Sequence, residues 1–321
     1  MVPRICGQFA TMTSTKRDFL KFTDFSYEEH QGLFRRAKVL KDARRKRRVV
    51  RTMAGRTLTM IFEKASTRTR LSFEAAMLQL GGSCIDLSAS NSQMSRGEPL
   101  ADTARVTGRY CDVVMMRTFA DARLEEFAAH CEVPVINGLT DGGHPVQILT
   151  DLFTIEERLG SVKGKTLAFI GDTASNMGRS FTRASSLFGF QLKLASPEGY
   201  HPSADVTDTA KGFVHLVRDP KEAVKGADAV ITDVWTSMGQ EAESAKRLKD
   251  LGGYQVNPEL MKLAAPHALF LHCLPAHREE EVTASVIDGP QSVVWDEAEN
   301  RMHVQKALLE FLVLENEKRG F

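Results

Sequence analysis

Short apolar runs alternate with longer amphipathic segments along most of the chain. The short runs have the length and the β-branched content of buried strands. They lie at residues 58–62, 84–87, 113–116, 133–136, 166–170, 192–195, 229–232, 268–271 and 293–295. Segments with helical periodicity fill most of the gaps between them, and this alternation predicts an α/β architecture with parallel sheets.

Two segments of helical periodicity have clear ends or a clear apolar face. Residues 145–159 start at Pro145 and stop before Gly160, which is typical of one long helix. Residues 302–314 place their apolar side chains on one side and predict an amphipathic C-terminal helix. These side chains are Val304, Ala307, Leu308, Phe311 and Leu312.

The order of these elements predicts two domains. A chain of 321 residues exceeds what one hydrophobic core usually fills. The long helix at 145–159 can join two α/β halves, so we place the boundary near residue 150. We therefore predict an α/β protein with two doubly wound domains, each a parallel sheet flanked by helices, and an active site in the cleft between them.

Charge and cysteine content narrow the classes of partner. The 42 Lys and Arg residues nearly balance the 41 Asp and Glu residues, and the net charge of +1 gives no overall attraction for nucleic acid or an acidic membrane. The basic run at 38–51 is best explained as a solvated helix face. The five cysteines contain no C-x-x-C pair, which argues against a disulfide framework or a zinc ribbon. No apolar stretch is long enough to span a bilayer, and we expect a cytoplasmic protein with small-molecule partners.

The turn at 66–70, with the sequence Ser-Thr-Arg-Thr-Arg, lies between an apolar run and a helical segment. The predicted helix begins near Ser66 or Thr67 and stops at Gly81-Gly82. Free backbone N–H groups, the positive end of the helix dipole, hydroxyls and guanidinium groups converge on this turn, which suits a phosphate. An ordinary N-cap followed by arginines on a solvated face has the same pattern, and these residues alone do not decide between the two interpretations.

Polar and ionisable residues follow the predicted strands at their carboxyl ends. In open α/β sheets this is the edge at which ligands bind. The clusters lie at 66–70, 117–118, 137–144, 171–176, 233–239, 272–278 and 296–301. Loops are polar in general, but the same edge recurs in both halves and predicts one shared cleft.

The turn at 171–178 follows a predicted strand and opens a predicted helix, which is the position of a dinucleotide-binding turn. Its glycines, Gly171 and Gly178, do not have the spacing G-x-G-x-x-G. The next strand ends in Ala195-Ser196-Pro197, where a dinucleotide-binding protein has an acidic residue. A bound dinucleotide is therefore not expected.

Cys273 lies between two histidines at the end of a predicted strand. A cysteine in this position is a candidate nucleophile, metal ligand or polar contact to substrate, and a buried structural cysteine is the usual alternative. His272 and His277 are five residues apart across a Leu-Pro step, which does not match helical zinc-ligand spacing. A metal site is therefore not expected.

Several of these segments, taken together, resemble the ornithine carbamoyltransferases. The matching elements are Ser66-Thr67-Arg68-Thr69-Arg70, Met116-Arg117-Thr118-Phe119, His144-Pro145-Val146-Gln147, Asp233-Val234-Trp235-Thr236-Ser237-Met238-Gly239 and His272-Cys273-Leu274-Pro275. The first and third elements are shared with the wider transcarbamoylase group, whereas the last two mark the ornithine branch. The resemblance extends from about Phe22 to the C-terminus.

The resemblance implies transfer of the carbamoyl group of carbamoyl phosphate to the δ-amine of L-ornithine, giving L-citrulline and phosphate. The reaction would belong to arginine biosynthesis or run in the reverse, catabolic direction, without metal or cofactor. Residues 1–149 would bind carbamoyl phosphate and residues 150–301 would bind ornithine. The helix at 302–321 would pack back on the first domain.

The resemblance also assigns site residues. Those implied to bind carbamoyl phosphate are Ser66, Thr67, Arg68, Thr69, Gln93, Arg117, His144, Gln147, Cys273, Leu274 and Arg301. Those implied to bind ornithine are Asn176, Asp233, Ser237 and Met238. Among these, Arg68, Arg117, His144 and Cys273 would be catalytic, with Cys273 as a hydrogen-bonding or proton-accepting group rather than a nucleophile. Gln93 matches a residue lent to a neighbouring subunit's site, which implies a homotrimer.

The implied mechanism depends on a neutral amine. A free alkyl amine has a pKa near 10.4, and a site containing Arg68, Arg117 and Arg301 would lower it, so the rate should rise on the alkaline side. Departures from the family pattern are few. Ser175 stands where many members have a second Asn, and Glu279-Glu280 stands where Gly is usual. The Leu274–Pro275 bond is expected to be cis.

Two rival interpretations remain at this stage. One is a transcarbamoylase with another acceptor, such as aspartate, putrescine or an acylated ornithine, and the Ser237-Met238-Gly239 loop argues against each of these. The other is a non-catalytic regulatory homologue. The presence of the implied catalytic residues makes this second interpretation the weaker one.

Overall fold

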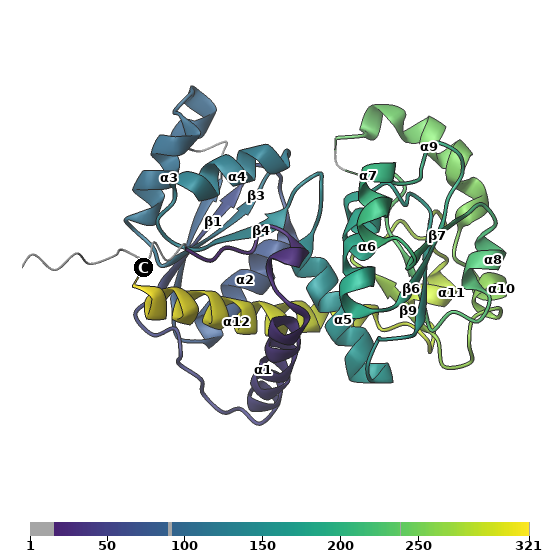
Figure 1. Cartoon of the computed structure of the whole chain (residues 1–321), viewed down its shortest axis with the longest axis horizontal. Coiled ribbons are helices and arrows are strands. Elements are labelled where there is room, and N and C mark those ends of the chain that lie inside the picture. Colours follow the sequence, from purple (N-terminus) through teal and green to yellow (C-terminus); the bar gives the residue numbers. More distant parts are fainter. Residues whose placement is uncertain (1–15, 89–91, 238, 321) are drawn as a thin grey trace, which may run out of the picture.

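The computed structural model describes residues 16–88, 92–237 and 239–320. They form two lobes that lie side by side, each with a sheet covered by helices (Figure 1). The first lobe contains β1 (Thr57–Phe62), β2 (Ser83–Ser88), β3 (Val113–Arg117) and β4 (Val135–Leu139), all parallel, in the order β2-β1-β3-β4. Met238 lies outside the described residues.

The second lobe contains a five-stranded parallel sheet. Its strands are β5 (Thr166–Ile170), β6 (Gln191–Ala195), β7 (Val214–Val217), β8 (Ala229–Thr232) and β9 (Leu269–His272), in the order β7-β6-β5-β8-β9. The predicted α/β class with two parallel sheets is therefore confirmed. The strand order reverses between β1 and β3 and again between β5 and β8, and ligands bind at such switch points.

Five helices position most of the chemistry. They are α1 (Tyr27–Arg45), α2 (Thr67–Gln79), α5 (Pro145–Leu159), α6 (Asn176–Phe188) and α12 (Val294–Arg319). The other helices are α3 (Leu100–Gly108), α4 (Asp121–His130), α7 (Ala204–Thr207), α8 (Pro220–Val224), α9 (Ser244–Leu251), α10 (Pro258–Met261), α11 (Ala284–Ile287) and the 3₁₀ turns η1 (Phe22–Asp24), η3 (Gln93–Arg96), η4 (Asp208–Ala210), η5 (Glu241–Glu243) and η6 (Gly252–Tyr254). Within the described part of the chain, no helix is both long enough and apolar enough to cross a membrane.

The last helix connects the two lobes. It starts beside the second sheet, where the N–H of Val293 donates to the carbonyl of Phe270 at 3.0 Å. It then runs along the first lobe and packs against α1, α2 and α5 (Figure 1). Leu308 and Leu312 of its apolar face are completely buried in the largest hydrophobic core, and Phe311 is partly buried against this core. The C-terminal segment is therefore a structural part of the first lobe.

The predicted strand at 293–295 is wrong. Val293 is the N-cap of α12, and this segment pairs with the second sheet only through the bridge between Phe270 and Ser292. Two adjacent valines mimic a strand, but Asp296 and Glu297 follow in the first helical turn, where the helix dipole favours negative charge.

Two other strand predictions differ in detail. The strand predicted at 133–136 begins at Val135, because Pro134 has no N–H and contributes only its carbonyl, which accepts from Val114 at 2.9 Å. Strand β7 was not predicted, because it is a four-residue edge strand with exposed side chains at two positions. The basic run at 38–51 is largely exposed as predicted, except that Lys41 is buried and pairs with Glu157.

Candidate active site

The turn at 66–70 is the N-terminus of α2, as predicted. Ser66 is the N-cap, and its Oγ accepts the N–H of Thr69 at 3.3 Å. The turn follows the carboxyl end of β1, so the positive end of the helix dipole faces the ligand edge of the first sheet. Thr69 is buried and Arg68 lines a cavity.

Arg301 of α12 joins this turn to α5. Its Nη2 donates to Thr69 Oγ1 at 3.0 Å and its Nη1 donates to Gln147 Oε1 at 2.8 Å. The Nε of this buried guanidinium has no hydrogen-bond partner in the described part of the chain. An unsatisfied buried donor of this kind is costly unless a ligand accepts from it.

The side-chain amide nitrogen of Gln147 donates hydrogen bonds to two buried carboxyl groups. Its Nε2 donates to Asp151 Oδ1 at 2.7 Å and to Glu297 Oε1 at 2.8 Å. Burial raises the pKa of Asp151 to about 7, and burial together with Asp151 raises the pKa of Glu297 well above its usual value. The two like charges oppose each other, so the pair retains a proton into the neutral pH range.

Arg117 and His144 add polar groups to the same edge. Arg117 is the last residue of β3. Burial is the main cause that lowers its pKa to about 10, and the positive charges of Arg301 and Arg68 lower it further. The guanidinium is still charged at neutral pH. His144 precedes α5, and its N–H donates to Ser180 Oγ at 2.9 Å. Burial and the nearby arginines lower the pKa of His144 well below its usual value, so its imidazole is neutral. Arg117 Nε and His144 Nδ1 have no partner among the described residues.

Asp233 and Cys273 come from the second sheet. Asp233 follows β8, Cys273 follows β9, and the thiol donates to Asp233 Oδ1 at 3.3 Å. Burial and the negative charge of Asp233 raise the pKa of Cys273 well above its usual value. The thiol is therefore protonated at neutral pH and is a weak nucleophile.

The side chain of His272 forms a hydrogen bond with the backbone of the loop after Cys273. Its Nδ1 accepts the N–H of Leu274 at 2.9 Å, and its Nε2 donates to Glu281 Oε1 at 3.0 Å. Leu274 has a φ of 57°, and the Leu274–Pro275 peptide is cis, as expected. The loop conformation therefore depends on the buried pair His272 and Glu281.

A cavity of about 260 Å³ is lined by residues from both lobes. Its walls come from α2, from the loop after β9 and from α12. The lining residues are Arg68, Leu71, Ser72, Ala75, His272, Cys273, Leu274, Glu297, Ala298, Glu299, Arg301 and Met302. Two guanidinium groups and a thiol thus share the lining of this space with two glutamates and several apolar side chains.

Comparison with known proteins gives a match over both lobes. Residues 17–157 match the aspartate/ornithine carbamoyltransferase family in its carbamoyl-P binding domain, and residues 163–312 match its Asp/Orn binding domain. The chain belongs to the aspartate/ornithine carbamoyltransferase family.

Relatives in this family are similar over nearly their whole length. An ornithine carbamoyltransferase of Chromobacterium violaceum is 55% identical over 94% of this chain and 98% of its own length. The anabolic ornithine carbamoyltransferase of Pseudomonas aeruginosa is also 55% identical, over 92% of this chain and 97% of its own. The crystal structure of ornithine carbamoyltransferase from Burkholderia thailandensis matches with a TM-score of 0.86 and 48% identity, covering 93% of this chain and 99% of that one.

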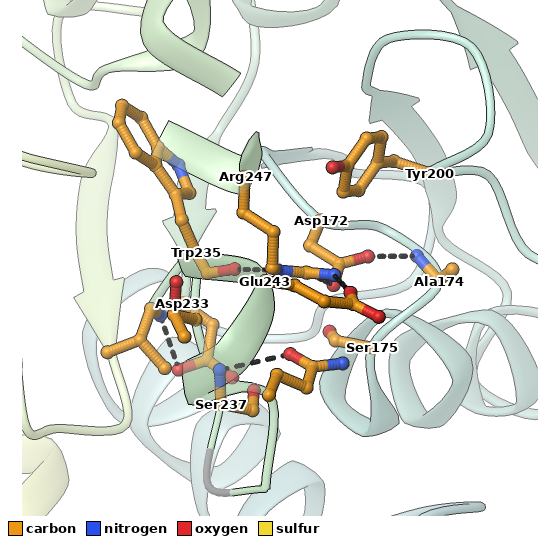
Figure 2. A network of polar contacts seen from close by, with 12 residues as sticks. Asp172, Ala174, Ser175, Tyr200, Asp233, Trp235, Ser237, Glu243 and Arg247 are labelled. Carbon is orange, nitrogen blue, oxygen red and sulfur yellow. Dashed lines mark hydrogen bonds and ion pairs between the residues drawn. The ribbon is translucent and has the colours of Figure 1, made fainter. Parts of the chain in front are cut away.

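For this member of the aspartate/ornithine carbamoyltransferase family, most of the predicted site residues lie at the carboxyl ends of the strands. Asn176 is the first residue of α6, and its Nδ2 donates to the carbonyl of Thr140 at 3.5 Å. Ser237 donates its N–H to Gln240 Oε1 at 3.1 Å (Figure 2). Gln93 lies in η3, is exposed and does not line the cavity.

Sequence reasoning missed several residues that hold the site. Asp151 lies four residues after Gln147, and Glu297 lies four residues before Arg301, so both pairs share a helix face. This spacing could have identified them. No comparable local signal marks Glu281, which reaches His272 across the loop. Ser175 is the N-cap of α6, and its hydroxyl accepts the N–H of Gly178 at 3.3 Å.

Proposed function

We propose that this chain is an ornithine carbamoyltransferase, which forms L-citrulline and phosphate from carbamoyl phosphate and L-ornithine. One observation carries the proposal. Arg301 bonds to both Thr69 at the N-terminus of α2 and Gln147, and it lines one cavity together with Cys273, whose thiol donates to Asp233. An anion site and an acidic site are thus adjacent, as the two substrates require. The names of the relatives, one of them anabolic, support the same reaction and favour arginine biosynthesis.

The phosphate side of the site, as we define it, consists of Ser66 to Thr69, Arg117, His144, Gln147 and Arg301. The first turn of α2, with Arg68, would bind the phosphate oxygens through backbone N–H groups and charge. Arg117 and His144 would polarise the carbamoyl carbonyl. Their donors would stabilise the negative charge that forms on its oxygen in the tetrahedral intermediate.

The acceptor side consists of Asn176, Asp233, Ser237, Met238, Cys273 and Leu274. Ornithine has an α-carboxylate and an α-ammonium group, which need amide or backbone donors and an acidic partner. Asp233 would supply that acid, and Asn176 and Ser237 would hold the remaining α-groups. The Cys273 thiol and the Leu274 backbone would lie beside the reacting amine, with Cys273 in a hydrogen-bonding role, which the raised pKa of its thiol supports.

The proposed reaction is a direct displacement. The neutral δ-amine adds to the carbamoyl carbon to give a tetrahedral intermediate. The C–O bond to phosphate then breaks, and the departing phosphate accepts the proton that the amine nitrogen loses. A site with three nearby arginines lowers the pKa of the amine, because a second cation is unfavourable there. The rate should therefore rise with pH until the bound amine is deprotonated.

The assembly and the division of labour are part of the proposal. Residues 1–149, completed by the helix at 302–321, would form the carbamoyl-phosphate-binding domain, and residues 150–301 the ornithine-binding domain. Gln93 lies exposed in η3 and would complete the site of a neighbour in a homotrimer. We place the enzyme in the cytoplasm.

The test is an acceptor screen. Purified protein is incubated with carbamoyl phosphate and, in parallel, ornithine, aspartate, putrescine or N-acetylornithine, and carbamoylated product is measured. We expect turnover with ornithine alone. Turnover with a different acceptor would keep the phosphate side and refute the acceptor side, and the absence of turnover with all four would favour a regulatory homologue. Sedimentation of the same sample tests the trimer.

A further inference from the structure

A buried ion pair links α9 to the turn that follows β5. Arg247 and Asp172 are only 6% and 7% exposed, and Arg247 Nη2 donates to Asp172 Oδ2 (Figure 2). Neither residue lines the cavity. Burying a guanidinium and a carboxylate together costs desolvation energy that their attraction only partly offsets, so stability alone is a weak reason for such a pair.

Each partner also holds one loop of the acceptor side. Arg247 Nε donates to the carbonyl of Trp235 at 2.5 Å, midway between Asp233 and Ser237. Asp172 Oδ1 accepts the N–H of Ala174 at 3.1 Å and so shapes the turn that leads to Asn176. One guanidinium therefore sets the distance between the loop after β5 and the loop after β8.

The two loops also pack against each other directly. Gly171 has a φ of 111°, and a Cβ at this position would lie 3.2 Å from Trp235 Nε1. The Tyr200 ring lies 5.1 Å from the Arg247 guanidinium and covers it from another side, and Tyr200 OH donates to Asp250 Oδ2 at 3.0 Å. The contact between the loops is thus close at Gly171 and held by charge at Arg247.

We propose that Arg247 and Asp172 are positioning residues for the acceptor, which hold Asn176 and Ser237 at the separation that its α-amino and α-carboxylate groups require. This inference rests on the proposed function. The two loops that the pair connects follow β5 and β8, the strands on either side of the switch point of the second sheet. The phosphate side, built on α2, α5 and α12, shares no hydrogen bond with Arg247 or Asp172 among those of the described residues.

The kinetic test uses Arg247→Gln, Arg247→Lys and Asp172→Asn. A misplacement of a binding group by about 1 Å costs up to about 100-fold, so we expect the KM for ornithine to rise by roughly 10- to 100-fold. The KM for carbamoyl phosphate should stay within about twofold of wild type. Arg247→Lys keeps the charge but cannot reach both Trp235 and Asp172 in a fork, and it should recover only part of the loss.

A non-reacting analogue separates positioning from chemistry. L-Norvaline has the α-amino and α-carboxylate groups of ornithine without the δ-amine, and its inhibition constant should rise by the same factor as the KM for ornithine. An unchanged inhibition constant, or equal increases in both substrates' KM values, would overturn the proposal. Because wild type is measured in the same assay, a failure of the proposed function appears as absent citrulline formation in wild type.

A matched control excludes a general loss of stability. Arg36 forms a two-point pair with Glu310, at 2.5 Å and 2.9 Å, between α1 and α12 and far from both loops. Arg36→Gln should lower the thermal unfolding midpoint without changing either KM. If Arg247→Gln does not fold, the same kinetics are measured with Arg247→Lys and Asp172→Asn. A KM for ornithine that stays at the wild-type value in these two variants would overturn the proposal.

Discussion

The phosphate side and the acceptor side of the proposed site are built in different ways. On the phosphate side, Thr69, Gln147 and Arg301 belong to three long helices, and Arg301 bonds directly to both Thr69 and Gln147. On the acceptor side, Asp233 and Ser237 lie in the loop after β8, and Asn176 is the first residue of α6. The proposed phosphate side is therefore preorganised by helix packing, whereas the proposed acceptor side depends more on the segments that follow β5 and β8. Loops can change without disturbing the helices, which is how one scaffold serves several acceptors.

The largest expected effect comes from removing the link between the helices. Arg301→Gln should lower kcat/KM for carbamoyl phosphate by about 1000-fold, because it removes a charge and the contacts to Thr69 and Gln147. Arg301→Lys should recover only part of this. The control is Glu315→Gln, on the same helix but paired with Lys318 at the surface. Activity of Arg301→Gln within threefold of wild type would contradict the role of this link.

A change on the acceptor side should be selective. Asp233→Asn should lower kcat/KM for ornithine by about 100-fold and leave carbamoyl phosphate binding within about twofold, because it removes the negative charge that pairs with the substrate ammonium. Steady-state kinetics with each substrate varied in turn measure both values. Equal losses for the two substrates would show that the two sides are not separate.

The buried carboxyl pair makes the phosphate side sensitive to pH. Burial raises the pKa of Asp151 to about 7, above the usual value of 3.8 for an exposed aspartate. Between these values the folded chain keeps a proton that the unfolded chain has lost, so the contribution of Asp151 to stability falls as pH rises from about 4 to about 7.

Asp151→Asn should remove this loss. The free energy of unfolding of the variant relative to wild type should increase over that range, by at most about 4 kcal/mol. Denaturant titrations at several pH values measure the difference, and comparison with wild type cancels the opposite contributions of His30 and His303, whose pKa values burial lowers to about 4. A difference that does not change with pH would show that Asp151 is not protonated in the folded chain.

The smallest effect concerns the loop after Cys273. Glu279 lies in this loop with a φ of 68°, a conformation that costs a side chain about 1 kcal/mol. Its Oε1 accepts the N–H of Ala284 at 2.8 Å, which offsets part of the strain. Glu279→Ala loses that contact and keeps the strain, whereas Glu279→Gly loses both.

Glu279→Gly should therefore be more stable than Glu279→Ala by about 1 kcal/mol, measured by denaturant unfolding. The KM for ornithine should be the same in both variants, since Glu279 lies outside the cavity. A Gly variant no more stable than the Ala variant would show that the loop relaxes around Glu279.

The sequence predicted the elements whose signals are local. Ser66 and the periodicity after it located α2, and Pro145 with Gly160 located α5. The strand prediction at 293–295 was wrong, because two adjacent valines form a strand only when a neighbouring strand pairs with them. That neighbour is fixed by tertiary structure.

The residues that support the site were harder to predict. Arg247 and Asp172 are 75 positions apart, and neither belongs to a recognisable motif. A charged residue in a helix is usually solvated, and nothing in the local sequence marks Arg247 as buried. Contacts of this kind are visible only when the fold brings the two loops together.

The path of α12 has a consequence for how the protein is made. Thr69 and Arg301 bond across 232 positions of sequence, so the first lobe emerges from the ribosome first but lacks one wall of its core until the last helix is synthesised. At typical elongation rates that delay is on the order of ten seconds. The second lobe, whose strands and helices lie between Thr166 and Ile287, can close within its own stretch of nascent chain. The half of the protein that is translated first is therefore the half that finishes folding last.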